Sequence, residues 1–188
     1  MNEVLDFWFG RSHSREFGKV QKKWFEKDAD FDAEVRDRFL AQYERAASGE
    51  LDSWQDSPEN CLALIVLLDQ FPRNMFRGTS QAFATDSKAL AASQHAINNN
   101  FDRELLTVQK WFMYLPFEHS ENLEHQQKSV ELFRELYGES DRDSMIEYAM
   151  RHFKVIERFG RFPHRNQILG RETTPEEAEF LKQPGSRF

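Results

Sequence analysis

Apolar side chains in this chain recur every three or four residues, which is the spacing of one face of an α-helix. In segment 30–48, Phe31, Val35, Phe39 and Tyr43 fall on one such face. The same spacing occurs in segments 58–70, 82–99, 104–115, 120–137 and 143–159, and shorter helices are expected near 2–9 and 18–25. No stretch alternates apolar and polar residues with a period of two, so no sheet is expected. The sequence therefore predicts an all-α fold.

Local start and stop signals agree with this periodicity. Asp30 can cap the start of the first long helix, and Gly49 follows its end. Residues 174–177 read Thr-Pro-Glu-Glu, a capping box with proline at the first helical position, so a last short helix is expected there. Pro72 and Pro116 are expected to end the helices that precede them.

The long helices are expected to pair into three consecutive antiparallel hairpins with short connections. The pairs are 30–48 with 58–70, 82–99 with 104–115, and 120–137 with 143–159. Stacked hairpins of this kind form a solenoid or a bundle, and the irregular spacing here predicts a TPR-like architecture with an irregular repeat. No linker rich in Ser, Gly or Pro interrupts the chain, so residues 1–188 are expected to form a single helical domain.

Composition restricts the classes of partner and the compartment. The net charge is −7 and the pI about 5.4, which argues against nucleic acid and against a membrane surface as partners. The longest apolar run, 61–68, is too short to span a bilayer, and the N-terminus has no pattern of a signal peptide. The one cysteine, Cys61, lies in that run and is expected to be a reduced core residue. We expect a soluble cytoplasmic protein.

Ionisable, aromatic and proline residues concentrate at three helix exits, 69–78, 116–121 and 160–166. If the three hairpins stack in parallel, their second helices all end on the same side. This arrangement would gather ten candidate ligand-binding residues: Asp69, Arg73, Asn74, Arg77, Glu118, His119, Arg161, His164, Arg165 and Asn166. The first and third exits also contain similar sequences, Phe-Pro-Arg-Asn and Phe-Pro-His-Arg-Asn.

Two functional hypotheses follow from this cluster. In the first, the protein is a binding module: the four arginines grip a small anionic ligand or an acidic peptide, because guanidinium groups match carboxylate and phosphate. In the second, it is a hydrolase in which Glu118 is the general base and His119 or His164 the acid. Asn74 and Asn166 would orient the backbone or the ligand.

Two further interpretations compete with these. Glu118, His119, His164 and Asp69 are residue types that bind zinc or manganese, but no His-Glu-x-x-His, cysteine cluster or Asp-rich loop is present, so neither metal nor cofactor is assigned. The other interpretation is structural: basic side chains after a helix end commonly bind its last carbonyls, and Asp69 can pair with Arg73 to lock the turn.

Several long motifs resemble one known family. They are Val-Leu-Asp-Phe-Trp-Phe-Gly at 4–10, Leu-Asp-Gln-Phe-Pro-Arg-Asn at 68–74, Tyr-Leu-Pro-Phe-Glu-His-Ser-Glu at 114–121, and Phe-Gly-Arg-Phe-Pro-His-Arg-Asn at 159–166. Shorter matches are Trp24-Phe25, 84–86, 169–171 and 174–177. Together they resemble the bacterial family catalogued as domain of unknown function 924, over nearly the whole chain. The resemblance implies a TPR-like helical fold and provides no catalytic residue to transfer.

Overall fold

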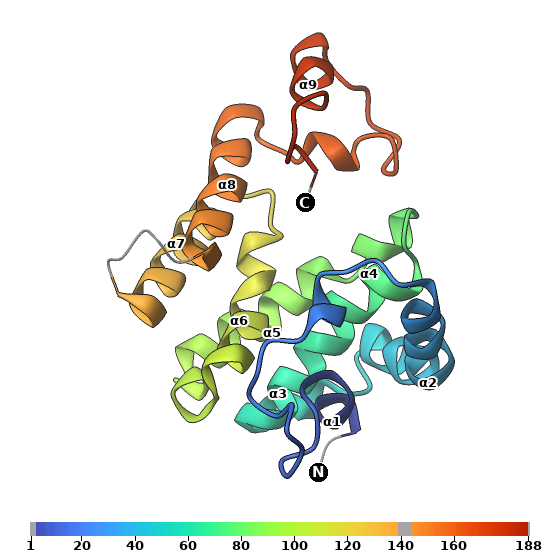
Figure 1. Cartoon of the computed structure of the whole chain (residues 1–188), viewed down its shortest axis with the longest axis vertical. Helices are drawn as coiled ribbons and strands as arrows, with labels where there is room; N and C mark the ends of the chain where they lie inside the picture. Colours follow the sequence, from blue (N-terminus) through green and yellow to red (C-terminus); the bar gives the residue numbers. More distant parts are fainter. Residues whose placement is uncertain (1–2, 139–143, 188) are drawn as a thin grey trace. The chain divides into compact units, whose positions relative to one another are not determined.

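A computed structural model describes residues 3–138 and 144–187, and every regular element in these ranges is helical (Figure 1). The predicted all-α class is thus confirmed. Backbone contacts divide the chain into two compact units: unit 1 is Met1–Arg77 with Gln81–Pro116, and unit 2 is Gly78–Ser80 with Phe117–Phe188. Each unit is described by itself below. The TPR-like arrangement and the single domain stay predictions.

The helical elements up to α6 begin in unit 1, except η4, which begins at Ser80 in unit 2. They are α1 (Glu3–Phe9), η1 (Lys22–Trp24), α2 (Ala29–Ser48), η2 (Asp52–Asp56), α3 (Pro58–Ile65), η3 (Val66–Gln70), α4 (Phe71–Met75), η4 (Ser80–Phe83), α5 (Asp86–Asn98), η5 (Phe101–Glu104) and α6 (Thr107–Glu118). The helix expected near 18–25 is only the short turn η1. Unit 2 continues with α7 (Leu123–Tyr137), α8 (Ser144–Phe159), η6 (Pro163–Arg165) and α9 (Pro175–Phe180). Asp143, at the start of the expected segment 143–159, lies outside the described residues.

Neither internal proline ends its helix, contrary to the prediction. Pro116 lies inside α6, which continues to Glu118. At Pro72 the helix widens first: η3 is a π-helical turn in which the N–H of Phe71 donates to Val66, and α4 then continues through Pro72. The N–H that proline lacks would have bonded the carbonyl of Leu68. The Thr85 hydroxyl donates to that carbonyl instead, at 2.6 Å, so the buried acceptor is satisfied.

The helix caps are mostly as expected. Gly49 ends α2 in the left-handed conformation, with a φ of 93°. The N-cap of α2 is Asp28 and not Asp30, since the Asp28 carboxylate accepts from the N–H groups of Asp30 and Phe31. The capping box that begins α9 is formed between Thr174 and Glu177.

Unit 1 packs around a nearly all-apolar stretch and an aromatic cluster. Residues 61–68 are all buried, and Trp8, Phe9, Phe39, Phe71 and Phe112 are among the largest fully buried side chains. Helix α2 packs mainly against α4, which lies beyond the expected partner segment 58–70, and also against η3 within that segment. Helix α5 packs mainly against α3, and its hydroxyl Ser93 Oγ donates to the Met113 carbonyl of α6. The expected pairing of 82–99 with 104–115 is therefore not the main packing of α5.

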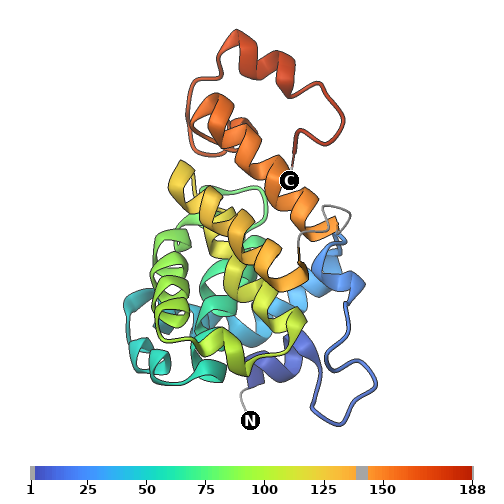
Figure 2. The same ribbon diagram turned by 90° about the vertical axis from the view of Figure 1, so that its left-hand side faces the viewer.

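Unit 2 contains the third predicted hairpin. Helices α7 and α8 pack side by side, which Figure 2 shows. After Gly160 ends α8 with a φ of 66°, the chain turns through η6 and a long loop to α9. A small apolar cluster of Val155, Ile156 and Phe162, with Phe159 and Phe180 against it, holds this end of the unit together.

None of the helices within the described ranges is both long and apolar enough to cross a lipid bilayer.

Candidate functional site

The first predicted exit, 69–78, lies in unit 1 up to Arg77. Its Arg73 is held by two carboxylates. Arg73 donates to both oxygens of Asp86, at 2.9 and 3.1 Å, and lies 3.3 Å from Asp69 Oδ1. It also donates to the Asp69 carbonyl at 2.5 Å. Burial would lower the pKa of Arg73, but the charges of Asp69 and Asp86 raise it above its usual value. Asp69 has no exposed side-chain surface, so this group of three is an internal ion cluster.

Asn74 and Arg77, also from the first exit, meet at a second carboxylate. Asn74 donates to Asp32 Oδ1 at 2.7 Å, and Arg77 donates to both Asp32 oxygens, at 2.6 and 2.7 Å. Burial acts to raise the pKa of Asp32, and the hydrogen bonds from Arg77 and Asn74 outweigh it and lower that pKa. These contacts join α4 to the first turn of α2.

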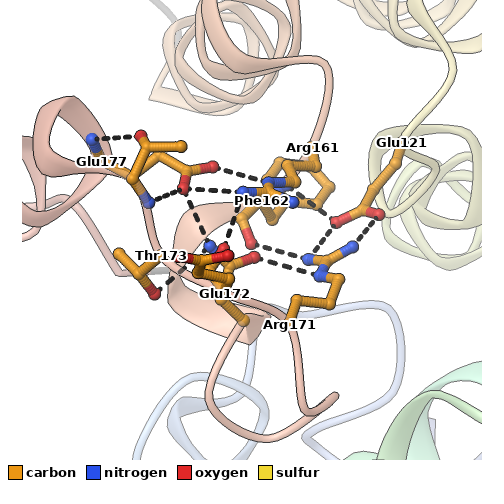
Figure 3. Close-up of polar contacts among 9 residues, drawn as sticks. Glu121, Arg161, Phe162, Arg171, Glu172, Thr173 and Glu177 are labelled. Atoms are coloured by element: carbon orange, nitrogen blue, oxygen red, sulfur yellow. Dashed lines mark hydrogen bonds and ion pairs between the residues drawn. The ribbon is translucent and has the colours of Figure 1, made fainter.

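In unit 2, the second and third exits meet through Glu121 (Figure 3). The Glu121 carboxylate accepts from the backbone N–H of Phe162 at 2.8 Å and from Arg171 at 2.6 and 2.9 Å. Arg171 also donates to the Phe162 carbonyl at 3.1 Å. Burial would raise the pKa of Glu121, but the hydrogen bonds from Arg171 and Phe162 lower it. The convergence that the sequence predicted is present for these two segments.

Arg161 and Asn166 from the third exit bind Glu177, the N3 residue of α9 (Figure 3). Arg161 donates to the two Glu177 oxygens at 2.6 and 2.8 Å, and Asn166 donates to Oε2 at 3.1 Å. The hydrogen bond from Arg161 is the largest cause that lowers the pKa of Glu177 to about 2, and burial opposes it. The Thr174 N–H also donates to this carboxylate. Glu177 thus attaches α9 to the end of α8.

Glu118 and His152 form a buried carboxylate–imidazole pair. Glu118 Oε1 lies 3.4 Å from His152 Nδ1, and the side chains are 1% and 4% exposed. His152 Nδ1 also lies 3.0 Å from the Tyr148 carbonyl. Because a carbonyl oxygen can only accept, Nδ1 holds the hydrogen and Nε2 has the lone pair. The ring packs edge-on to Phe162, with centroids 5.5 Å apart.

Basic side chains lie near this pair. Burial lowers the pKa of His152 well below its usual value, and His119, Arg165 and His164 lower it further. Burial likewise lowers the pKa of His164 to about 4, with Arg165 as the next cause. The guanidinium of Arg165 lies 4.5 Å from the centroid of the Phe162 ring. Both imidazoles are therefore neutral at pH 7, although they lie beside a carboxylate and a cation.

The predicted site residues fall into two groups. Asp69, Arg73, Asn74 and Arg77 belong to unit 1, while Glu118, His119, Arg161, His164, Arg165 and Asn166 belong to unit 2. Their assignment to a ligand site stays a prediction. The alternative pairing of Asp69 with Arg73 is present, and Cys61 is a buried thiol whose pKa burial raises to about 12.

Three participants were missing from the predicted site: His152, Arg171 and Glu177. His152 is not among the candidates of the sequence analysis, yet it lies three residues after Ala149 and four before Ile156, both buried. That helical spacing could have placed it inside. Arg171 and Glu177 lie within the short family motifs 169–171 and 174–177. Sequence spacing gives no signal that Arg171 binds Glu121 or that Glu177 binds Arg161.

In residues 3–138 and 144–187, no three His, Cys, Asp or Glu side chains lie together in an arrangement that could hold a metal ion.

Fold and motifs together define an all-α protein with a polar core in its second unit. The chain belongs to the family described as bacterial protein of unknown function (DUF924), whose model matches residues 4–185. It is similar to the structure of a protein of unknown function from Agrobacterium tumefaciens, with 42% sequence identity and a TM-score of 0.84. The likeness covers 95% of this chain and 94% of that one. No curated protein matches the sequence.

Proposed function

We propose that the protein is a binding module for a small anion, and that unit 2 binds it at His119, His164 and Arg165. The supporting observation is the group of basic side chains around the buried pair Glu118 and His152. His119, Arg165 and His164 all act to lower the pKa of His152; Arg165 is charged at pH 7, and His164 becomes cationic only as pH falls toward 4. His119 and His164 are half-buried, while Arg165 is 7% exposed.

The other predicted cations have a different role in this proposal. Arg73, Arg77 and Arg161 each make two hydrogen bonds to a carboxylate of the chain itself. A bidentate pair of this kind already uses the guanidinium edge that would receive a ligand. We therefore assign them to holding helices together, and assign the ligand to the imidazole-rich group.

Sulfate is a suitable probe because its charge stays −2 between pH 4 and 8. A bound anion favours the protonated imidazole, so it raises the pKa of His164 from about 4. The pKa is higher in the bound state, and affinity must therefore increase as pH falls from 7 toward 4. Titration of the imidazole C–H signals by NMR, with and without sulfate, measures this directly.

Arg165→Gln is the decisive variant, and Arg158→Gln is its matched control. Arg158 belongs to the same unit, loses the same charge, and pairs on the surface with Glu176. We expect sulfate affinity, measured by calorimetry, to fall about tenfold or more in Arg165→Gln, which is about 1.4 kcal/mol, and to stay within twofold in Arg158→Gln. Equal affinities in the two variants would contradict the proposal. An acidic peptide, tested in the same way, separates a peptide partner from a small anion.

A second candidate function, hydrolysis, rests on the Glu118–His152 pair. Glu118 would hold the imidazole and stabilise its charge, and His152 Nε2 would accept a proton from the attacking water. His119 or His164 would then protonate the leaving group. A screen with phosphate and acyl esters tests this: Glu118→Gln should lower any turnover while the circular dichroism spectrum stays native. Turnover that is unchanged in Glu118→Gln would remove this candidate.

A further inference from the structure

The chain between α1 and α2, in unit 1, forms a long loop that contains the short turn η1 (Figure 1). Residues of this loop line an open cavity. The cavity has a volume of about 540 Å³. Its lining residues are Arg15, Glu16, Lys19, Val20, Gln21, Lys22 and Lys23. Pockets that bind small organic molecules are typically about 300 to 1,000 Å³, so the cavity is of a suitable size.

The loop is fixed at its C-terminal end. Trp24 Nε1 donates to the Trp8 carbonyl at 3.0 Å, and the Trp24 ring packs edge-on to Phe112 with centroids 4.8 Å apart. The adjacent Lys23 donates to the Phe7 carbonyl at 2.7 Å. Because Trp8 and Phe112 are buried core residues, this wall of the cavity is held in position by the core.

Charge in the cavity is opposite to that of the chain. Four lining residues are cationic and one, Glu16, is anionic, which gives a local charge of 4 − 1 = +3, whereas the whole chain has −7. Within the described residues, Arg15, Lys19 and Lys22 form no ion pair with a carboxylate. Burial lowers the pKa of Lys23, and the nearby carboxylates of Glu16 and Glu34 offset this only in part, so the charge is costly at this position. An anion in the cavity would offset both effects.

Gln21 provides an independent observation. Its amide nitrogen, Nε2, is buried and has no hydrogen-bond acceptor within the described residues. A buried donor without an acceptor costs about 1–3 kcal/mol, so such groups are rare in folded proteins unless a water or ligand completes them. Here the donor belongs to a side chain that lines the cationic cavity, so a small adjustment of that side chain would let it donate to a bound anion.

We propose that this cavity binds the phosphate group of a small organic phosphate. Several closely spaced cations favour a ligand with two negative charges over a ligand with a single carboxylate. Phosphate oxygens can also accept hydrogen bonds from arginine, lysine and an amide at the same time. Val20 is 56% exposed and lines the same cavity, which provides an apolar contact for the organic part. The site is separate in sequence and chemistry from the imidazole-rich group of unit 2.

Phenyl phosphate, with inorganic phosphate beside it, tests the proposal in the full-length protein. We expect Lys22→Gln to weaken phenyl phosphate binding at least fivefold by calorimetry. Lys27→Gln, an exposed lysine of the same loop that does not line the cavity, should leave affinity within twofold. The side-chain amide signal of Gln21 should shift on binding in NMR spectra. Phenyl phosphate should bind more tightly than inorganic phosphate, because only the ester can contact Val20.

Three results would overturn the proposal: equal affinities in Lys22→Gln and Lys27→Gln, an unshifted Gln21 amide at saturation, or binding to phosphatidic acid vesicles without binding to phenyl phosphate. The last result would assign the loop to a lipid surface. Arg165→Gln separates this site from the proposed function, since it should weaken the pH-dependent binding of sulfate in unit 2 about tenfold or more and leave the Gln21 shift unchanged.

Discussion

Replacing Glu177 by glutamine should destabilise unit 2 in a way that depends on pH. The Glu177 carboxylate accepts from Arg161, Asn166 and the Thr174 N–H, and its pKa is about 2 in the folded protein against 4.5 for an ordinary glutamate. A shift of this size corresponds to about 3 kcal/mol of stability. Solvent at the nearby surface screens the pairing, so we expect about 1.5 kcal/mol in practice.

The sign follows from the direction of the shift. A folded-state pKa below the unfolded one means that the ionised group stabilises the fold. This contribution is complete above about pH 4.5 and is lost as pH falls toward 2. At pH 3 roughly two fifths of it remains. The difference between the parent protein and Glu177→Gln should therefore shrink from about 1.5 to about 0.6 kcal/mol between pH 7 and pH 3.

Glu176→Gln is the matched control for this experiment. Glu176 precedes Glu177 in α9, but its side chain is 65% exposed and pairs with Arg158 at the surface, so its loss should cost under about 0.5 kcal/mol. Urea unfolding should be followed by circular dichroism, because all four tryptophans lie in unit 1 and their fluorescence reports that unit. Equal destabilisation by the two substitutions, or a difference that does not change with pH, would refute the reasoning.

Three further substitutions or reagents test unit 1. Arg73→Gln leaves the buried Asp69 without its cation and should cost about 3–5 kcal/mol, measured by urea unfolding with tryptophan fluorescence; a cost no larger than that of the exposed Arg45→Gln would contradict the ion cluster. Thr85→Val removes the donor to the Leu68 carbonyl beside Pro72 and should cost about 1–3 kcal/mol, whereas a neutral result would mean that this acceptor finds another partner. Cys61, whose pKa burial raises to about 12, should not react with a disulfide reagent at pH 8 until urea unfolds the protein; rapid labelling of the native protein would disprove its burial.

Helices were predictable because their signals are local. Apolar spacing depends only on residues three and four apart, and Gly49 and Thr174 act on the turn beside them. The prediction for Pro72 failed because a proline need not end a helix when its lost hydrogen bond is replaced. Pro72 is tolerated through a π-helical turn and through Thr85, a residue 17 positions beyond the carbonyl it satisfies. No local pattern contains that information.

The candidate site was predictable in residue type but not in pairing. The sequence showed that Glu118, His164 and Arg165 are polar residues at predicted helix exits. It could not tell that Arg161 would be bound by Glu177, because that contact requires the loop between 166 and 174 to fold back. The sequence therefore located the polar segments. Only the structure distinguished basic side chains that pair with carboxylates of the chain, such as Arg161, from the basic side chains that lie near His152.

Cations that pair with a carboxylate of the chain and cations that line the unit 1 cavity should affect stability in opposite ways. Neutralising Arg73 removes an attraction, and the protein loses stability. Neutralising Lys22 removes a repulsion among the lining cations of the unit 1 cavity, so the ligand-free protein should gain a few tenths of a kcal/mol, because like charges on neighbouring side chains destabilise by about that amount. Binding sites commonly have such a cost, since the groups that receive a ligand are arranged against the stability of the empty fold. Tryptophan-monitored unfolding at low ionic strength measures the sign, and a loss of stability in Lys22→Gln equal to that in Arg73→Gln would show that the loop lysines are structural.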